Sequence, residues 1–219
     1  PDKVYLPLLQ HTGTPLQPLV KKGDLVKRGQ KIADADAFVT APLHSPIAGK
    51  VLGIEECPHP TRGKFGAIVI ENSGSQEDEI NGILFQEEIE RMDPKSIQNW
   101  IREGGIVGLG GAAFPTHVKV SPPSGKKIDT LIINGAECEP FITCDHRVMM
   151  ERTDFILTGA YVLARAGGAQ KIIFGIEKNK PDCIEKITQS IQNISIPAQV
   201  FPHRVVYHQG SGTHFILTI

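Results

Sequence analysis

A glycine-rich stretch is the first candidate for ligand binding in this sequence. Residues 104–119 read GGIVGLGGAAFPTHVK. The four small residues at 110–113 let the backbone approach a flat ligand or a phosphate closely, with N–H groups free to donate. Phe114 supplies an aromatic face, and Lys119 brings a mobile positive charge within reach of a phosphate. The stretch is therefore either a binding loop or a bare turn.

A second candidate stretch, residues 134–140, reads NGAECEP and directly follows a strand of the buried type. Ligands gather at the carboxyl ends of strands in open α/β sheets. Asn134 carries both a donor and an acceptor, which suits the edge of a flavin ring. Glu137 and Glu139 are able to accept hydrogen bonds from ribose hydroxyls or from a nicotinamide amide. The alternative interpretation is a solvated acidic turn.

The cysteines and histidines give no pattern typical of a metal site. Cys57, Cys138, Cys144 and Cys183 are scattered, with no CxxC pair among them. Iron–sulfur and structural zinc sites usually place two ligands within about two to four residues, so we expect no cluster and no metal site in this chain. Scattered thiols also favour a reducing compartment over a disulfide framework. His146 has no evident role.

Composition excludes several functional classes. The chain has 219 residues, 40% of them hydrophobic and 21% charged, which is typical of a folded globular protein of one large or two small domains. Lys and Arg number 23 against 24 Asp and Glu, so a nucleic-acid partner is not expected. No apolar run approaches the about 20 residues that cross a bilayer, and we expect membrane association only through partners.

The elements that must position these residues fall into two groups. Short strands at 37–40, 50–54 and 67–70 alternate with Gly and Pro turns, which predicts a small all-β domain over residues 1–72. A polar and acidic stretch then predicts a linker over residues 73–92.

Residues 93–219 alternate helices and strands, which predicts a parallel, Rossmann-like α/β sheet. The final apolar run, residues 215–219, is of a kind that continues into a strand, so we expect the chain to be a fragment that stops within an element. The other expected elements are a helix starting at Asp93-Pro94, a strand at 130–133, a helix at 148–165, a strand at 171–176 and a helix capped by Asn179.

The first domain resembles lipoyl and biotinyl domains. The resemblance lies in residues 18–30, PLVKKGDLVKRGQ, and residues 41–51, APLHSPIAGKV. It implies a flattened barrel-sandwich hybrid. The carriers of that family present a lysine on the hairpin between the two segments, whereas residues 33–37 here read ADADA. We therefore expect an unmodified barrel with a structural or docking role.

The two candidate stretches, in this order, closely resemble the C subunit of the Rnf electron-transport complex. The matching segments are residues 108–119, GLGGAAFPTHVK, and residues 134–147, NGAECEPFITCDHR. Both are also similar to the NADH-binding flavoprotein subunit of respiratory complex I, and residues 176–181, IEKNKP, match the Rnf pattern. The resemblance implies an α/β Rossmann-like FMN- and NADH-binding domain preceded by a small all-β barrel-sandwich hybrid domain.

The resemblance also implies sites for FMN and NADH. A hydride would pass from NADH to the flavin, and electrons would leave singly to iron–sulfur clusters. No catalytic acid or base is expected, because hydride transfer between stacked rings moves no proton through a side chain. The implied FMN contacts are Gly108, Gly110, Gly111, Ala112, Lys119, Asn134 and Glu137. The implied NADH contacts are Phe114 and Glu139.

In relatives of this family, two [4Fe–4S] clusters follow the segment that ends here at Ile219, so the exit for electrons is expected outside this chain. The resemblance implies a peripheral subunit on the cytoplasmic, inner face of a bacterial membrane, bound to the other subunits of the complex. Leu109 fits the Rnf branch, but residues 207–214, YHQGSGTH, lack the glutamate expected near Gly212. Two alternatives stay open: a non-catalytic docking module of the same fold and a relative of cobalamin reductases.

Overall fold

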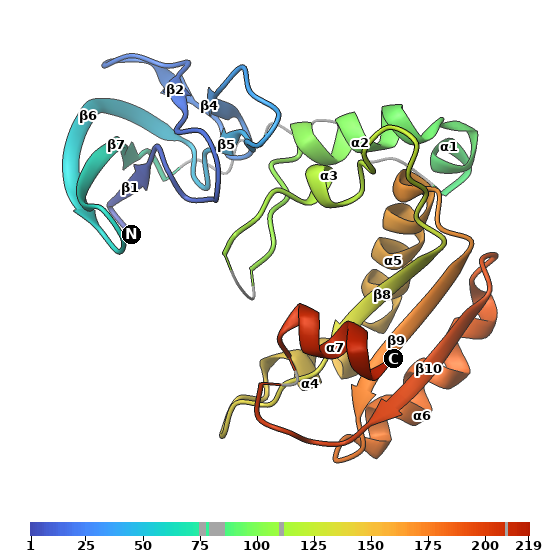
Figure 1. Cartoon of the computed structure of the whole chain (residues 1–219). Helices are drawn as coiled ribbons and strands as arrows, with labels where there is room; N and C mark the ends of the chain where they lie inside the picture. Colours follow the sequence, from blue (N-terminus) through green and yellow to red (C-terminus); the bar gives the residue numbers. More distant parts are fainter. Residues whose placement is uncertain (75–77, 79–85, 110–111, 209) are drawn as a thin grey trace. The chain divides into compact units, whose positions relative to one another are not determined.

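The computed structural model describes residues 1–74, 78, 86–109, 112–208 and 210–219, and its contacts divide the chain into two compact units (Figure 1). The first unit is Pro1–Ser121 and the second is Pro122–Ile219. The described elements of the first unit are β1 (Lys3–Pro7), β2 (Gln17–Pro18), β3 (Leu25–Val26), β4 (Lys31–Asp34), β5 (Leu43–His44), β6 (Gly49–His59), β7 (Gly63–Asn72), α1 (Gln86–Arg91), α2 (Pro94–Glu103) and α3 (Thr116–Lys119). Those of the second are β8 (Thr130–Gly135), α4 (Cys144–Glu151), α5 (Thr153–Gly167), β9 (Lys171–Glu177), α6 (Pro181–Ser190), a 3₁₀ turn (Ile191–Asn193), β10 (Ala198–His203) and α7 (Gly212–Thr218).

Two small antiparallel sheets form the β part of the first unit. One has the order β1-β7-β6-β3 and the other the order β2-β4-β5. The strands expected at 50–54 and 67–70 are present within β6 and β7. The strand expected at 37–40 is wrong. Residues 37–39 form bends, Thr40 is irregular, and the Val39 carbonyl accepts from Thr14 N–H in a loop–loop hydrogen bond instead of joining a ladder.

Helix α2 begins where the sequence predicts. The Asp93 carboxylate accepts a hydrogen bond from Ser96 N–H at 3.1 Å, and Pro94 is the first helical residue. This is the side-chain cap that offsets the unpaired amides of a helix start. Ile97 and Ile101 lie on one face of α2 and are buried.

Ion pairs attach α2 to the hairpin that carries a lysine in lipoyl domains. The Arg102 guanidinium donates to Asp34 Oδ1 at 2.8 Å and to the Ala35 carbonyl at 3.0 Å. Lys31 pairs with Glu103. The compact unit that contains the barrel extends to Ser121, and helix α1 lies within residues 73–92. The expected domain bounds, 1–72 and 93–219 with a linker at 73–92, stay a prediction.

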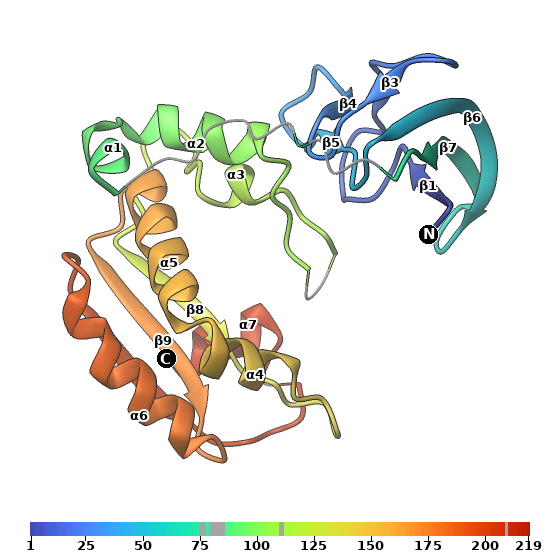
Figure 2. The same ribbon diagram turned by 180° about the vertical axis from the view of Figure 1, so that it is seen from behind.

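The second unit is an α/β structure built on a parallel sheet of order β10-β9-β8. Thr130 pairs with Lys171, and Ala198 pairs with Ile172, each at the start of a ladder. Helices α5 and α6 connect consecutive strands along one face of the sheet, and α7 lies on the opposite face (Figures 1 and 2). This arrangement confirms an α/β domain with parallel strands, while its assignment as Rossmann-like stays a prediction.

Three expectations for the second unit are wrong. The helix expected at 148–165 is two helices, which break at Arg152, and the Thr153 hydroxyl donates to the Met149 carbonyl beside the break. Asn179 does not cap α6, since Lys180 takes the cap position without a side-chain bond. Residues 215–218 belong to a helix, α7, because Phe215 packs on the sheet where Gly175 leaves room for its ring.

Across the described part of the chain, we find no helix with the length and apolar character needed to span a membrane.

We predict an acid-dependent loss of stability from the α2–hairpin contact. Burial raises the pKa of Asp34, but the hydrogen bonds from Arg102, Ala35 and Lys31 outweigh it and leave the pKa below its usual value. Such a group stabilises the fold above its unfolded-state pKa, and the contribution is lost as the pH falls through the folded-state pKa. Asp34→Asn should therefore lower the free energy of unfolding by about 0.5–1 kcal/mol at neutral pH. The variant should also lose less of its stability than the wild type as the pH falls below about 5.

Urea denaturation between neutral and acid pH measures this effect. Asp36→Asn, two residues along the same hairpin and exposed, is the matched control and should follow the wild type. An Asp34→Asn curve that parallels the wild type at every pH would contradict the assignment.

Candidate functional site

The glycine-rich stretch forms a closed loop in the first unit. Gly108 N–H donates to the Phe114 carbonyl at 3.0 Å, and Thr116 N–H donates to the Ile106 carbonyl at 2.9 Å. Val107 and Pro115 form an antiparallel bridge between them. Gly110 and Gly111, both predicted FMN contacts, lie outside the described residues.

The barrel holds the far side of this loop. The Thr12 hydroxyl donates to the Ala112 carbonyl at 2.5 Å, and Thr12 N–H donates to the Ala113 carbonyl at 3.2 Å. Ala113 has a φ of +50°, a left-handed conformation that this pair of bonds maintains. No sequence pattern indicated Thr12, because the two partners are 100 residues apart. The predicted contact Ala112 therefore has its carbonyl engaged with the barrel.

Lys119 faces the start of the loop. A Cβ atom on Gly108 would lie 3.0 Å from Lys119 Nζ, so a side chain there would crowd the ammonium group. Lys119 is exposed, and among the described residues none pairs with its charge. An unpaired ammonium beside open backbone is suited to an anion such as a phosphate. The predicted residues Gly108, Phe114 and Lys119 are thus brought together.

In the second unit, Asn134 fixes the end of β8. Its Nδ2 donates to the Gly210 carbonyl at 2.8 Å, and its Oδ1 accepts from Ala136 N–H at 3.0 Å. The side chain is exposed and retains one N–H donor and one lone pair. Asn134 therefore links β8 to the loop before α7 and keeps a single donor for a ligand.

Glu137 turns inward and caps α4. Its Oε1 accepts from Asp145 N–H at 2.8 Å, and its Oε2 lies 3.4 Å from His146 N, a weaker contact. Thr143, the N-cap residue, supplies no side-chain bond of its own. A carboxylate at this position satisfies orphan amides and complements the helix dipole. Glu137 is only 5% exposed, so in this structure its oxygens serve the fold.

A buried charge network surrounds this cap. Lys180 Nζ lies 3.8 Å from Glu137 Oε2 and donates to Glu177 Oε2 at 2.5 Å. Glu137 N–H also donates to Glu177 Oε2 at 3.2 Å. Glu177 is fully buried, and its Oε1 has no partner within the described residues. Lys180 and Glu177 belong to the IEKNKP segment, to which sequence reasoning assigned no role.

Glu139 behaves differently from Glu137. It is exposed, and the Cys138 thiol lies beside it, with Sγ 3.9 Å from Oε2. Phe141, two residues on, is fully exposed and has a φ of +68°. Of the two predicted acidic contacts, Glu139 is therefore the one that presents its carboxylate to solvent.

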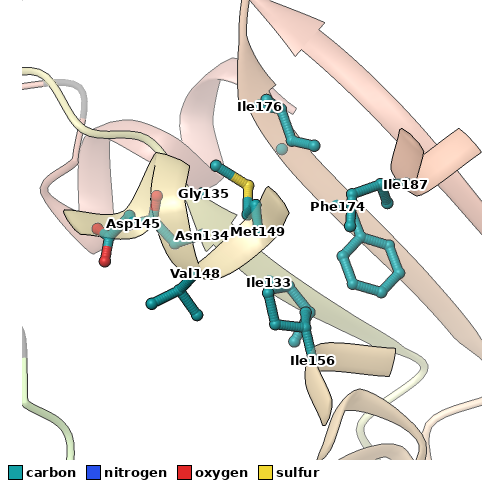
Figure 3. A pocket seen from close by; sticks show the side chains of 11 residues that line it. Ile133, Asn134, Gly135, Asp145, Val148, Met149, Ile156, Phe174, Ile176 and Ile187 are labelled. Atoms are coloured by element: carbon teal, nitrogen blue, oxygen red, sulfur yellow. The ribbon is translucent and has the colours of Figure 1, made fainter. Parts of the chain in front are cut away.

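A cavity of about 190 Å³ lies where β8 and β9 meet α4 (Figure 3). Apolar side chains line most of it, including Met149 and Phe174, while Asn134 and Asp145 supply the polar part. Burial, together with the nearby Glu137 carboxylate, raises the pKa of Asp145. Asp145, whose N–H donates to Glu137, thus also lines the cavity.

Two family models cover most of the chain. Residues 101–219 match the Nuo51 FMN-binding domain, and residues 1–75 match the RnfC barrel sandwich hybrid domain. Fold and sequence thus define a class of protein in which an FMN-binding domain of the complex I type follows a barrel-sandwich hybrid. More particularly, the chain belongs to the family of C subunits of the Rnf-type ion-translocating oxidoreductase complexes.

Curated relatives support that family, and each of the three named here is a C subunit. The chain is 44% identical over 211 residues to that of the proton-translocating ferredoxin:NAD(+) oxidoreductase complex of Clostridium ljungdahlii, covering 96% of this chain and 46% of the relative. It is 39% identical over 220 residues to that of the Na(+)-translocating ferredoxin:NAD(+) oxidoreductase complex of Acetobacterium woodii, covering 100% of this chain and 49% of the relative. The C subunit of the ion-translocating oxidoreductase complex of Rhodobacter capsulatus is 37% identical over 221 residues, which cover 100% of this chain and 42% of the relative. The chain spans about half the length of these relatives or less.

The structure is similar to one chain in a crystal structure of an NAD+-reducing [NiFe]-hydrogenase in the H2-reduced state. The similarity covers 58% of this chain and 25% of the hydrogenase chain. The sequence identity is 22% and the TM-score is 0.48.

The positions of Glu137 and Glu139 predict unequal losses of stability when each is replaced by alanine. Glu137→Ala leaves two helix amides of α4 and part of the Lys180 charge without a buried partner, and should cost about 1–3 kcal/mol. Glu139→Ala removes an exposed side chain, so its free energy of unfolding should stay within about 0.5 kcal/mol of the wild type. Urea denaturation measures both, and hydrogen exchange at Asp145 and His146 should speed up only in Glu137→Ala. Equal stability of the two variants would contradict the capping role.

Proposed function

We propose that this chain is the FMN-binding and NADH-oxidising part of a subunit in a membrane-associated electron-transport complex. It passes electrons toward iron–sulfur clusters that lie outside the chain. Its partners are the other subunits of the complex, and its place is peripheral, on the cytoplasmic face of a bacterial membrane. The relatives' names, which specify ferredoxin:NAD(+) oxidoreductase complexes, support the electron-transfer role and the use of NAD in this proposal.

The observation that carries the proposal is the loop of residues 106–116 with its unpaired Lys119, inside the segment that matches an FMN-binding family. The lack of a Cβ on Gly108 leaves room beside the ammonium group, and one cation near open backbone fits the phosphate of FMN. We assign the phosphate to Lys119 and the loop contacts to Gly108, Gly110, Gly111 and Ala112.

The remaining predicted contacts are Asn134, Glu137 and Glu139 of the second unit and Phe114 of the first. Asn134 would use its remaining donor toward the flavin. Glu137 stays a predicted FMN contact. In the present arrangement its carboxylate caps α4, so it would contribute to FMN binding by holding residues 134–140 in position. Exposed Glu139 would accept hydrogen bonds from NADH, and Phe114 would offer its ring to NADH. Bound FMN supplies the chemistry, since it accepts a hydride and releases electrons singly.

Lys119→Ala is the sharpest test of FMN binding. Loss of a charge-assisted hydrogen bond to phosphate removes about 1.5–3 kcal/mol, so the FMN dissociation constant should rise about tenfold or more. Quenching of flavin fluorescence by the full chain measures the constant. Lys22→Ala, an exposed lysine in the same unit, should bind like the wild type. Failure of the wild-type chain to bind FMN would overturn the proposed function, whereas unchanged binding by Lys119→Ala would remove only this residue's role.

Glu139→Gln separates NADH from FMN. A neutral amide accepts weaker hydrogen bonds than a carboxylate, so NADH affinity should fall about tenfold while FMN affinity stays the same. The rate of flavin reduction in the FMN-loaded chain, measured against NADH concentration, gives the apparent affinity. Glu185→Gln, an exposed carboxylate on α6, is the matched control. An equal loss of FMN binding in Glu139→Gln would contradict the assignment.

A non-catalytic docking module is the second candidate. Its support is that Glu137 and much of Asn134 are already engaged within the fold, and that the segment near Gly212 lacks the expected glutamate. Rapid NADH-driven reduction of a dye by the FMN-loaded chain would exclude this alternative.

A further inference from the structure

Three different metal-binding side chains meet where α4 packs against α6. His146 comes from the first turn of α4, and Asp182 and Cys183 from the first turn of α6. His146 Nε2 lies 2.8 Å from Asp182 Oδ2. One ligand atom from each of the three residues lies within 4.8 Å of the other two. No residue of this cluster belongs to the site proposed for FMN or NADH.

The packing of the two helices holds this arrangement in place. Cys183 is fully buried, and its thiol lies 3.8 Å from the His146 carbonyl, which it faces as a donor. Cys183 N–H donates to Asp182 Oδ1 at 2.9 Å, so the second carboxylate oxygen is the one turned to His146. Asp182 is exposed and His146 is half-buried. The cluster therefore has one solvent-facing side, from which water can complete the coordination of an ion.

We propose that His146, Asp182 and Cys183 form a binding site for a divalent transition-metal ion of the Zn²⁺ type. An imidazole nitrogen, a carboxylate oxygen and a thiolate sulfur are a ligand set that Zn²⁺ accepts and that Mg²⁺ and Ca²⁺ do not favour. Three protein ligands and a water match the open form of a zinc site. The ion would replace the hydrogen bond between His146 and Asp182 with a bond to each.

The charges around the cluster act in both directions. The carboxylates of Asp182 and nearby Glu137 favour a cation, while Lys180 and Lys186 oppose it. Without an ion, burial and the Asp182 charge raise the pKa of the Cys183 thiol to about 11. The incoming metal ion must therefore displace the thiol proton to solvent as the metal–sulfur bond forms.

Cobalt titration of the metal-free full chain tests the proposal, in a buffer with a phosphine reductant. Co²⁺ bound to a thiolate gives an intense near-ultraviolet charge-transfer band, which oxygen ligands alone do not give. We expect one equivalent of Co²⁺ to develop this band and Zn²⁺ to displace it. His146→Ala and Cys183→Ser should each weaken binding more than about tenfold, since even indirect supports of a metal site cost about that much.

Cys144→Ser is the matched control, because Cys144 is an exposed thiol at the start of the same helix and belongs to a different cluster with Glu137 and Asp145. It should keep the band. His146→Ala changes a half-buried side chain and keeps the test decisive even if Cys183→Ser does not fold. Absence of the band with the wild type, wild-type affinity in His146→Ala, or loss of the band in Cys144→Ser would each overturn the assignment.

Discussion

A carboxylate can be buried next to a helix start only if its oxygens accept hydrogen bonds and its charge is paired. Glu137 meets both conditions through Asp145 N–H and Lys180, with a longer contact to His146 N. Because α4 has no side-chain cap at Thr143, its first turn depends on a residue that precedes it by a whole loop. The same loop carries the exposed Glu139. Because Glu137 anchors the loop to α4, it also determines where the Glu139 carboxylate lies.

The surroundings of single residues in the candidate site could not be predicted from the motifs. Glu137 and Glu139 are two apart on one segment and look equivalent in the sequence, yet one is buried and the other exposed. Burial of the Glu137 charge requires Lys180, which follows β9 and lies beside Glu137 only in the folded sheet. Residue type and spacing contain no information about such a distant partner, and the same holds for Thr12 at the glycine-rich loop.

Local rules succeeded where the determinant is local. Asp93 and Pro94 start α2 because a cap and a fixed φ act within one turn, and the apolar runs in β6, β7, β8 and β9 are strands. They failed at the apolar run of residues 215–219, which suits a strand but of which residues 215–218 form a helix. There the deciding contact is the Phe215 ring over Gly175, a glycine forty residues earlier whose missing side chain leaves the space.

The hairpin of residues 33–37 places a limit on what the barrel can do. In the carrier domains that it resembles, this hairpin presents a lysine, which is absent from residues 33–37 here. Here the tip is fastened to Arg102 through Asp34 and the Ala35 carbonyl. Arg102 of α2 thus holds this hairpin within the first unit, and movement of the hairpin would require breaking both hydrogen bonds.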